Sequence, residues 1–276
     1  MRLQAPAVAR PAAGASRQLR RSARPLLTVE EVSIRFGGVE ALRSISLDVR
    51  PGAITALIGP NGAGKTTTFN CVSGIYRPDK GRILIQDRPV TGSAPQLRPQ
   101  LGLARTYQQP QIFADLTVRE NLDMGLRMQE RLGRRFLFAP ALNRASRGEK
   151  ATEIARLCGY EGPLDAYADS LSFGALRVVE VARALCLAPD LLMLDEPAAG
   201  LDVHSITALT GLLASLRDTG VGVLLIEHDM GVVMGLADDI VVLDFGEVIA
   251  RGSAAEVRRS PKVIEAYLGD QGGNDA

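Results

Sequence analysis

The sequence predicts an α/β fold, in which helices cover a mainly parallel β-sheet, and three observations support this prediction. Apolar runs of strand length occupy residues 53–58, 191–195, 221–226 and 240–243. A segment with helical spacing, 205–216, separates the second run from the third. The first run leads into a glycine-rich loop and then into another helical segment, 65–72. Strands that alternate with helices are typical of a parallel sheet with helices on its faces.

The amino-terminal quarter of the chain has a different pattern. Residues 1–25 contain six arginines and no acidic residue, and their low hydrophobicity predicts a disordered tail rich in Arg, Ala and Pro. Apolar and polar residues then alternate at 32–36 and at 45–49, which indicates two half-buried strands joined by a turn at Gly37. A further strand is expected at 81–86.

Composition limits the classes of function. With 276 residues, 46% of them hydrophobic and 23% charged, the chain is long enough for one large globular domain. The whole chain has 31 acidic residues and 32 lysines and arginines, so the part after the arginine-rich tail is mildly acidic. This charge, with no Trp for base stacking, argues against nucleic acid as a partner. No apolar run approaches the roughly 18 residues that span a bilayer.

The cysteines do not predict a metal site or a disulfide framework. Cys71, Cys158 and Cys186 lie far apart, without CxxC spacing, in apolar surroundings. We therefore expect three reduced thiols in the core.

The loop after the first apolar run reads GPNGAGKT, residues 59–66, and fits the P-loop pattern GxxxxGK[ST]. Its glycines let backbone N–H groups converge on phosphate oxygens, and the helix that follows adds positive potential. Lys65 is expected to reach the β- and γ-phosphates, and Thr66 to place its hydroxyl on Mg²⁺. A dinucleotide-binding loop is excluded because the GxGxxG pattern is not matched.

Two carboxylates follow the second apolar run. Strand ends of this kind lie beside the phosphate loop in an open α/β sheet. Asp195 is therefore expected to hold Mg²⁺ through water, and Glu196 to polarise the water that attacks the γ-phosphate. An Asp-Glu pair alone could cap a helix, but the P-loop favours the functional interpretation.

The middle of the chain, 116–187, has helical periodicity, with a loop-rich centre at about 136–143. Thr117, followed three residues later by Glu120, has the spacing of a capping box at a helix start. We expect a helical subdomain at about 111–189.

Further motifs make the chain resemble the ATP-binding subunits of ABC transporters. LSFG at 171–174 is similar to the family signature, which is commonly LSGGQ. Gln108 matches the Q-loop glutamine, AGLD at 199–202 the D-loop, and His228 the switch histidine. Phe36 matches the aromatic residue that stacks on adenine in this family.

The resemblance covers residues 26–269 and leaves 270–276 as a flexible tail. It implies a P-loop NTPase (RecA-like) ABC nucleotide-binding domain, with the inserted helical subdomain and an antiparallel β subdomain. Two such domains would pack head to tail, with each ATP between the P-loop of one and the signature loop of the other.

The resemblance also implies an ATPase with ATP and Mg²⁺ as cofactors. The expected catalytic residues are Lys65, Glu196 and His228, and the expected Mg²⁺ site is formed by Thr66, Gln108 and Asp195. The nucleotide is expected to contact Phe36, Gly59, Asn61, Gly62, Gly64, Lys65, Thr66, Thr67, Gln108, Ser172, Gly174 and Asp202.

Several assignments leave an alternative open. Gln109 could serve in place of Gln108, and Phe36 could be a core residue of its strand. His228 could be a buried, hydrogen-bonded histidine. His204 is expected to be solvated or to cap a helix.

The signature departs from the common form, because Phe173 replaces its first glycine and Ala175 its glutamine. Ser172 and Gly174 keep their donor groups. The loss of a polar contact predicts that the ATP site completed by this loop is weaker than its counterpart.

Four stretches resemble the ATPases of branched-chain amino acid importers: RFGG at 35–38, ART at 104–106, EPAAGL at 196–201 and VIEAYLG at 263–269. This resemblance implies two membrane permease subunits, a second ATPase subunit in a homodimer or heterodimer and, indirectly, a substrate-binding protein. The chain would then lie peripherally at the cytoplasmic face of the inner membrane.

Other functions remain alternatives. A urea or amide importer and a lipid exporter use related ATPases. A soluble ABC ATPase outside transport usually carries two cassettes or long coiled coils, and this chain shows neither. A nucleotide-binding scaffold without turnover is disfavoured by the presence of Lys65, Asp195, Glu196 and His228.

Overall fold

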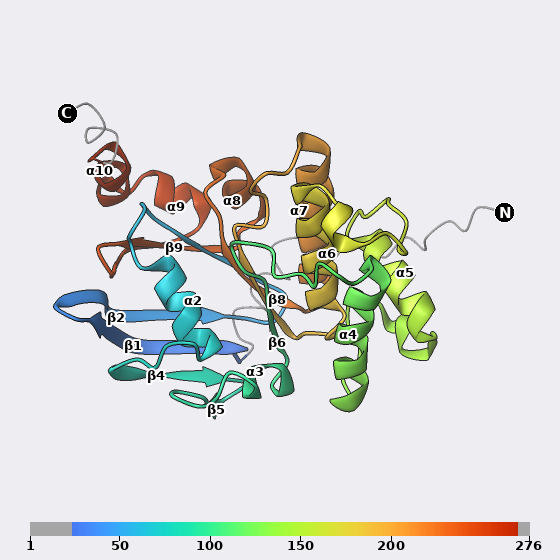
Figure 1. Cartoon of the computed structure of the whole chain (residues 1–276). Helices are drawn as coiled ribbons and strands as arrows, with labels where there is room; N and C mark the ends of the chain where they lie inside the picture. The colour runs from blue at the N-terminus through green and yellow to red at the C-terminus, as the bar shows by residue number, and fades with distance from the viewer. Residues whose placement is uncertain (1–23, 270–276) are drawn as a thin grey trace.

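The computed structural model describes residues 24–269, and one of its two sheets is antiparallel, with strand order β2-β1-β4-β5 (Figure 1). β1 and β2 form a hairpin whose turn includes Gly37, at a φ of +59°. This sheet is the antiparallel β subdomain that the family resemblance implied. Its strands are β1 (Leu27–Phe36), β2 (Val39–Val49), β4 (Lys80–Ile85) and β5 (Arg88–Pro89).

The second sheet has six strands in the order β10-β9-β3-β8-β7-β6. Its pairings are parallel except for the antiparallel edge pair β9–β10. The predicted parallel sheet is therefore confirmed. Its strands are β3 (Ile54–Ile58), β6 (Leu103–Arg105), β7 (Leu191–Asp195), β8 (Gly222–Ile226), β9 (Asp239–Asp244) and β10 (Glu247–Gly252).

Parallel pairing brings distant segments to one edge of this sheet. Because β3, β8, β7 and β6 are neighbours and run in the same direction, the residues that follow them meet at their carboxyl ends. The P-loop, His228, Glu196 and Gln108 follow these four strands in that order.

A group of helices occupies the middle of the chain and lies to one side of the parallel sheet (Figure 1). α4 starts with the predicted capping box, since Thr117 and Glu120 exchange the expected hydrogen bonds. The predicted loop-rich centre contains one short 3₁₀ helix, Pro140–Arg144. The helices are α4 (Val118–Arg131), α5 (Arg147–Leu157), the 3₁₀ helix Ala168–Ser170 and α6 (Phe173–Leu185).

The core follows the alternation of side chains along the strands. In β7, Leu192 and Leu194 join the cluster formed with α4, α5, α6 and α7. Leu191 and Met193 face the other way, into a cluster with α2 and the antiparallel sheet. Strands buried on both faces explain why their sequences are continuously apolar.

The remaining helices are α2 (Lys65–Ser73), α3 (Leu97–Gln100), α7 (Val203–Asp218), α8 (Met230–Leu236), α9 (Ala254–Arg258) and α10 (Pro261–Gly269). The predicted helices at 65–72 and 205–216 correspond to α2 and α7. The sequence analysis did not predict α3, β6, α8, β10 or α9. Within residues 24–269, no helix is both long and apolar enough to cross a membrane.

The expected tails lie almost wholly outside the described residues, and the helical subdomain boundaries at 111–189 stay a prediction. All three cysteines are buried and free, as predicted for core thiols.

Candidate active site

The phosphate-binding loop begins where the buried strand β3 ends. Gly59 must be glycine, because a Cβ atom there would lie 2.0 Å from the backbone oxygen of Leu243. Gly64, at a φ of +103°, occupies the N-cap position of α2, and no side chain caps this helix. The first backbone N–H groups of α2 are therefore not taken up by a side-chain cap, which is the arrangement that attracts a phosphate.

Lys65 lies inside this loop. Its side chain is buried, and Nζ donates to the backbone oxygens of Gly59 and Pro60 at 2.6 and 2.8 Å. Asn61 and Thr66 are exposed and Thr67 is half-buried on the same stretch. The ammonium group of Lys65 and the N-terminus of α2 therefore both attract negative charge to this loop.

Two predicted residues from other strand ends, His228 and Gln108, meet Glu196. His228 Nε2 lies 2.9 Å from Glu196 Oε1, and Gln108 Nε2 lies 3.3 Å from both carboxylate oxygens. Glu196 itself has a φ of +50°, a region that non-glycine residues avoid. Its backbone N–H donates to Ile226 of the neighbouring strand at 2.9 Å, which holds the turn in place.

These positions bear on two of the alternatives left open by the sequence. His228 is exposed rather than buried, so the interpretation as a core histidine is wrong. The side-chain amide of Gln108 donates to Glu196, whereas that contact is not made by Gln109. His204 is exposed near the start of α7, as expected for a solvated residue.

Asp195 is the buried member of the carboxylate pair. Burial raises the pKa of its carboxyl above the usual value, and the nearby charge of Arg105 opposes that rise. One oxygen, Oδ2, lies 3.3 Å from Arg105 Nη2. The other, Oδ1, is buried without a hydrogen-bond partner among the described residues.

An orphaned carboxylate oxygen fits a Mg²⁺ site, because this ion prefers oxygen ligands and usually keeps several waters. No group of three or more His, Cys, Asp or Glu side chains between residues 24 and 269 is arranged to hold a metal. A metal at Asp195 would therefore rely on hydroxyl, amide, water or phosphate oxygens as its other ligands. Thr66 and Gln108 are the predicted protein donors of that kind.

The signature loop lies in other surroundings. Ser172 is the N-cap of α6, and its hydroxyl accepts from the backbone N–H of Ala175 at 3.3 Å. It lines an open cavity of about 670 Å³ with Gly174 and Asp202. No residue of the P-loop lines this cavity. Asp202 caps α7 by accepting from Ser205 N–H at 2.7 Å, which lowers the pKa of its carboxyl.

Phe36 ends β1 on the surface, with 44% of the residue exposed. Irregularities in the β1–β2 register between Val32 and Arg35 interrupt the strict alternation, so the interpretation as a core residue is wrong. Its ring meets Tyr76 edge to face, with centroids 5.0 Å apart. Tyr76 was not predicted, since nothing in its sequence context points to this contact.

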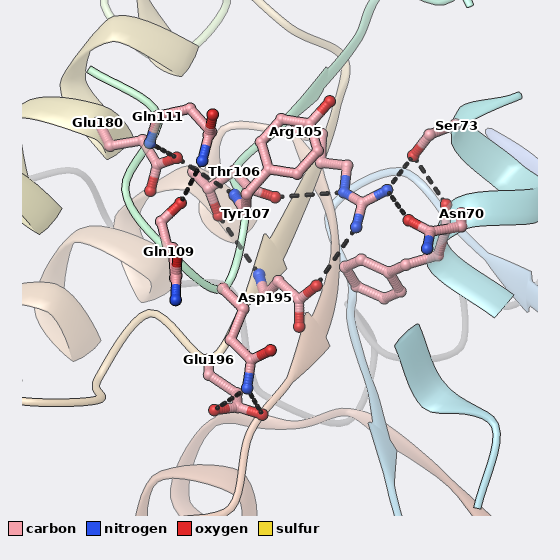
Figure 2. Close-up of polar contacts among 12 residues, drawn as sticks. Asn70, Ser73, Arg105, Thr106, Tyr107, Gln109, Gln111, Glu180, Asp195 and Glu196 are labelled. Atoms are coloured by element: carbon pink, nitrogen blue, oxygen red, sulfur yellow. Dashed lines mark hydrogen bonds and ion pairs between the residues drawn. The ribbon is translucent and has the colours of Figure 1, made fainter. Parts of the chain in front are cut away.

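The sequence analysis also missed two charged residues that hold the backbone of the Q-loop around Gln108. Arg177 and Glu180, both buried on α6, form an ion pair at 3.1 Å. Glu180 Oε1 accepts the backbone N–H groups of Tyr107 and Gln111 at 3.2 and 3.1 Å (Figure 2). Arg177 donates to the backbone oxygens of Tyr107 and Gln108.

Comparison with known proteins gives two matching families. The family described as "ABC transporter" matches residues 42–199. The family described as "Branched-chain amino acid ATP-binding cassette transporter" matches residues 247–272.

Named relatives match nearly the whole chain. The high-affinity branched-chain amino acid transport ATP-binding protein LivG of Salmonella typhimurium is 41% identical over 89% of this chain and 98% of its own. BraF of Pseudomonas aeruginosa, with the same description, is 40% identical over 90% and 99%. The lipopolysaccharide export ATP-binding protein LptB of Acidithiobacillus ferridurans is 35% identical over 83% and 91%.

Solved structures agree with this grouping. The ADP conformation of an ATP-binding cassette of an ABC transporter has a TM-score of 0.75 and 30% identity, and the match covers 90% of this chain and 100% of that one. A nucleotide-free cassette has a TM-score of 0.74 and 29% identity, over 88% and 99%.

Proposed function

The chain belongs to the ABC transporter family of ATP-binding proteins, and from this premise we propose that it powers an importer of branched-chain amino acids by hydrolysing ATP. The observation that carries the proposal is the convergence of Gln108, Glu196 and His228 at strand ends beside the P-loop. A catalytic carboxylate held between an amide and an imidazole is suited to orienting a water molecule.

The residues support a division of labour. Lys65 and the N-terminus of α2 offset the charge of the β- and γ-phosphates. Thr66, Gln108 and Asp195 would hold Mg²⁺, which supplies charge neutralisation at the phosphates. Phe36 would stack on the adenine.

Glu196 would then align the attacking water. As the water oxygen bonds to the γ-phosphorus and the bond to the leaving ADP oxygen breaks, the carboxylate accepts the proton. His228, 2.9 Å away, fixes the orientation of Glu196. Such positioning is the main contribution of protein groups to phosphoryl transfer.

The signature loop supports a paired arrangement. Ser172 and Gly174 lie at the start of α6 in a cavity that excludes the P-loop of the same chain. They would therefore serve the nucleotide of a second ATPase subunit, in a homodimer or a heterodimer. The head-to-tail pair would sit against two membrane permease subunits at the cytoplasmic face of the inner membrane.

The cargo assignment depends on the relatives. LivG and BraF are both described as branched-chain amino acid transport proteins, and the matching carboxyl-terminal family has the same association. LptB, described as a lipopolysaccharide export protein, is less similar over a smaller part of the chain. In such importers a binding protein outside the membrane would select the cargo.

Replacing the proposed water-orienting carboxylate tests the reaction. We expect Glu196→Gln to bind ATP about as tightly as the wild type, with turnover reduced about 100-fold or more, because the amide cannot accept the proton. Glu153→Gln, on the exposed face of α5, is the matched control and should hydrolyse ATP normally. Hydrolysis by Glu196→Gln at the wild-type rate would refute the assignment.

The cargo has its own test. Uptake of labelled leucine should fall in cells that lack this gene and return with the wild-type chain but not with Glu196→Gln. Unlabelled valine should compete, whereas urea and acetamide should not. Unchanged leucine uptake would contradict the cargo and leave the ATPase assignment intact.

A further inference from the structure

A buried guanidinium connects the phosphate-binding helix to the carboxylate strand. Arg105, the last residue of β6, donates from Nη1 to Asn70 Oδ1 and Ser73 Oγ on α2, each at 2.8 Å (Figure 2). Nε donates to the backbone oxygen of Thr106 at 3.2 Å, and Nη2 to Asp195 Oδ2 at 3.3 Å. Its side chain is only 6% exposed. One cation therefore has four acceptors, two on α2, one on β7 and one in the residue that follows β6.

Aromatic rings restrict the same group. The guanidinium carbon lies 4.6 Å from the centroid of the Tyr107 ring and 5.4 Å from that of Phe69. Contacts of this kind hold the plane of a guanidinium as well as its charge. The backbone N–H of Asp195 also donates to Thr106 Oγ1 at 3.3 Å, so two consecutive residues, Arg105 at the end of β6 and Thr106 after it, contact Asp195.

We propose that Arg105 is a positioning residue for the Mg²⁺ site. It holds Oδ2 of Asp195, so that Oδ1, buried and without a hydrogen-bond partner among the described residues, is left for the metal or its water. It also fixes Asp195 relative to α2, the helix that carries Lys65 and Thr66. The inference rests on the proposed function, because it takes Asp195 as a metal-site residue.

The contact geometry explains why the residue is arginine. An ammonium group has three N–H donors at one point, whereas the guanidinium spreads five over a rigid fork. Only the fork can reach Asn70 and Ser73 on one side and Asp195 on the other. Arg105→Lys therefore keeps the positive charge beside Asp195 but loses the fixed geometry. The variant separates the effect of the charge from the effect of the geometry.

The test measures the effect of Mg²⁺ on nucleotide binding by the purified full chain, with a fluorescent ATP analogue as the probe. In wild type, Mg²⁺ should strengthen binding. In Arg105→Lys, the Mg²⁺ concentration for half of this effect should rise about tenfold, the scale seen when a residue behind a metal ligand is changed. Affinity in EDTA should change less than about twofold, because Arg105 contacts no residue of the P-loop segment 59–66 among its hydrogen-bond partners.

Arg98→Lys is the matched control. Arg98, on α3, is also a buried arginine that contacts α2. It donates to the backbone oxygens of Val72 on α2 and of Val90, each at 3.0 Å, but its hydrogen bonds do not include Asp195. It should lose thermal stability to a similar extent and keep the wild-type Mg²⁺ midpoint. An equal Mg²⁺ shift in Arg98→Lys would overturn the proposal, since the effect would then follow from destabilisation alone.

A milder variant covers the case in which Arg105→Lys does not fold. Asn70→Ala removes one acceptor of the guanidinium and leaves the buried charge pair intact, so a smaller shift in the same direction is expected. A wild-type midpoint in every foldable variant of Arg105 and Asn70 would overturn the inference. If Mg²⁺ has no effect on binding by the wild-type chain, the proposed function fails instead, so the two failures are distinguishable.

Discussion

Glu196 occupies a backbone conformation that costs energy. A φ of +50° is unfavourable for a side chain with a Cβ, by about 1–3 kcal/mol. The cost is offset by the hydrogen bond from its N–H to Ile226 and by the fully buried strand before it. The turn directs the carboxylate toward His228 and Gln108, so the strain lies at the residue proposed to orient the attacking water.

Gly59 offers a sharper prediction at the residue scale. In Gly59→Ala the new Cβ would lie 2.0 Å from the backbone oxygen of Leu243, at a φ of +148°. We expect the free energy of unfolding to fall by about 3 kcal/mol, together with a loss of ATP binding. Urea denaturation and fluorescent nucleotide binding measure both quantities.

The control for this change is Gly38→Ala, whose Cβ would meet no atom within 4 Å. It should alter stability by no more than about 0.5 kcal/mol. Equal stability of the two variants would contradict the steric argument.

Residues whose positions follow from chain spacing were predictable, and residues whose positions depend on distant contacts were not. Lys65 and Glu196 stand at fixed offsets from a loop and a strand end, which the sequence displays directly. Arg105 contacts Asp195, which lies 90 positions later in the chain. Glu180 contacts Tyr107, which lies 73 positions earlier. A charged residue in an apolar helix, such as Glu180, was the signal available, but it did not identify the partner.

At the scale of elements, α6 connects the two loops that are proposed to contact nucleotide, the signature loop and the Q-loop. Ser172 begins the helix, and Glu180, two turns later, holds the backbone of the Q-loop. The helix is a rigid connection between a residue proposed for the partner's nucleotide and Gln108, proposed for this chain's own.

Glu180→Gln tests this connection. It would leave Arg177, 1% exposed, without its counter-charge in the core. Breaking a buried pair from one side costs about 3–5 kcal/mol, so we expect a loss of that size in the free energy of unfolding. Turnover should fall as well, because the Q-loop loses its anchor.

The comparison for this variant is Glu153→Gln. Glu153 pairs with Arg156 on the surface of α5, and exposed pairs contribute about 1 kcal/mol or less. A stability loss no larger in Glu180→Gln than in Glu153→Gln would show that α6 does not depend on the buried pair.

Elements with a clear period were predictable, and short ones were not. The capping box of α4 and the apolar runs of β3, β7, β8 and β9 gave their elements directly. β6 has only three residues, too few for any period, although it carries Arg105 and leads to Gln108. Its place at the sheet edge is fixed by pairing with β7, which is a tertiary contact.

At the scale of the whole molecule, the two faces of the parallel sheet separate the core into distinct clusters. The cluster with α2 contains Cys71, and the cluster with the helical group contains Cys158 and Cys186. The continuously apolar runs of these strands predicted two buried faces. It could not predict strand order, because order is set by how α2, α7 and the crossovers pack.

The buried thiols give a prediction for the intact chain. Burial, with a smaller effect from Asp79, raises the pKa of Cys71 to about 11, and burial also raises the pKa of Cys158 and Cys186. All three should be protonated at neutral pH and react very slowly with iodoacetamide, since the thiolate is the nucleophile. Labelling should remain slow until the pH approaches the pKa of Cys71, about 11, or until the chain unfolds.

Mass spectrometry of the alkylated native and denatured protein measures this difference. The denatured chain, in which no thiol is buried, should take up three labels. Rapid labelling of one thiol in the native protein at neutral pH would contradict the burial of that residue.

The signature loop and the P-loop of one chain line different parts of the molecule, and this separation has a kinetic consequence. If the P-loop of one chain works only with the signature loop of a second chain, two chains must meet before ATP is hydrolysed. Hydrolysis by the isolated chain is then second order in protein concentration. Its total rate should rise with the square of the protein concentration when the chain is dilute, and linearly once pairs are saturated. Membrane partners that hold two chains side by side would give the two loops a fixed effective concentration, independent of the protein concentration. Transport would then proceed at protein concentrations at which the isolated chain does not hydrolyse ATP.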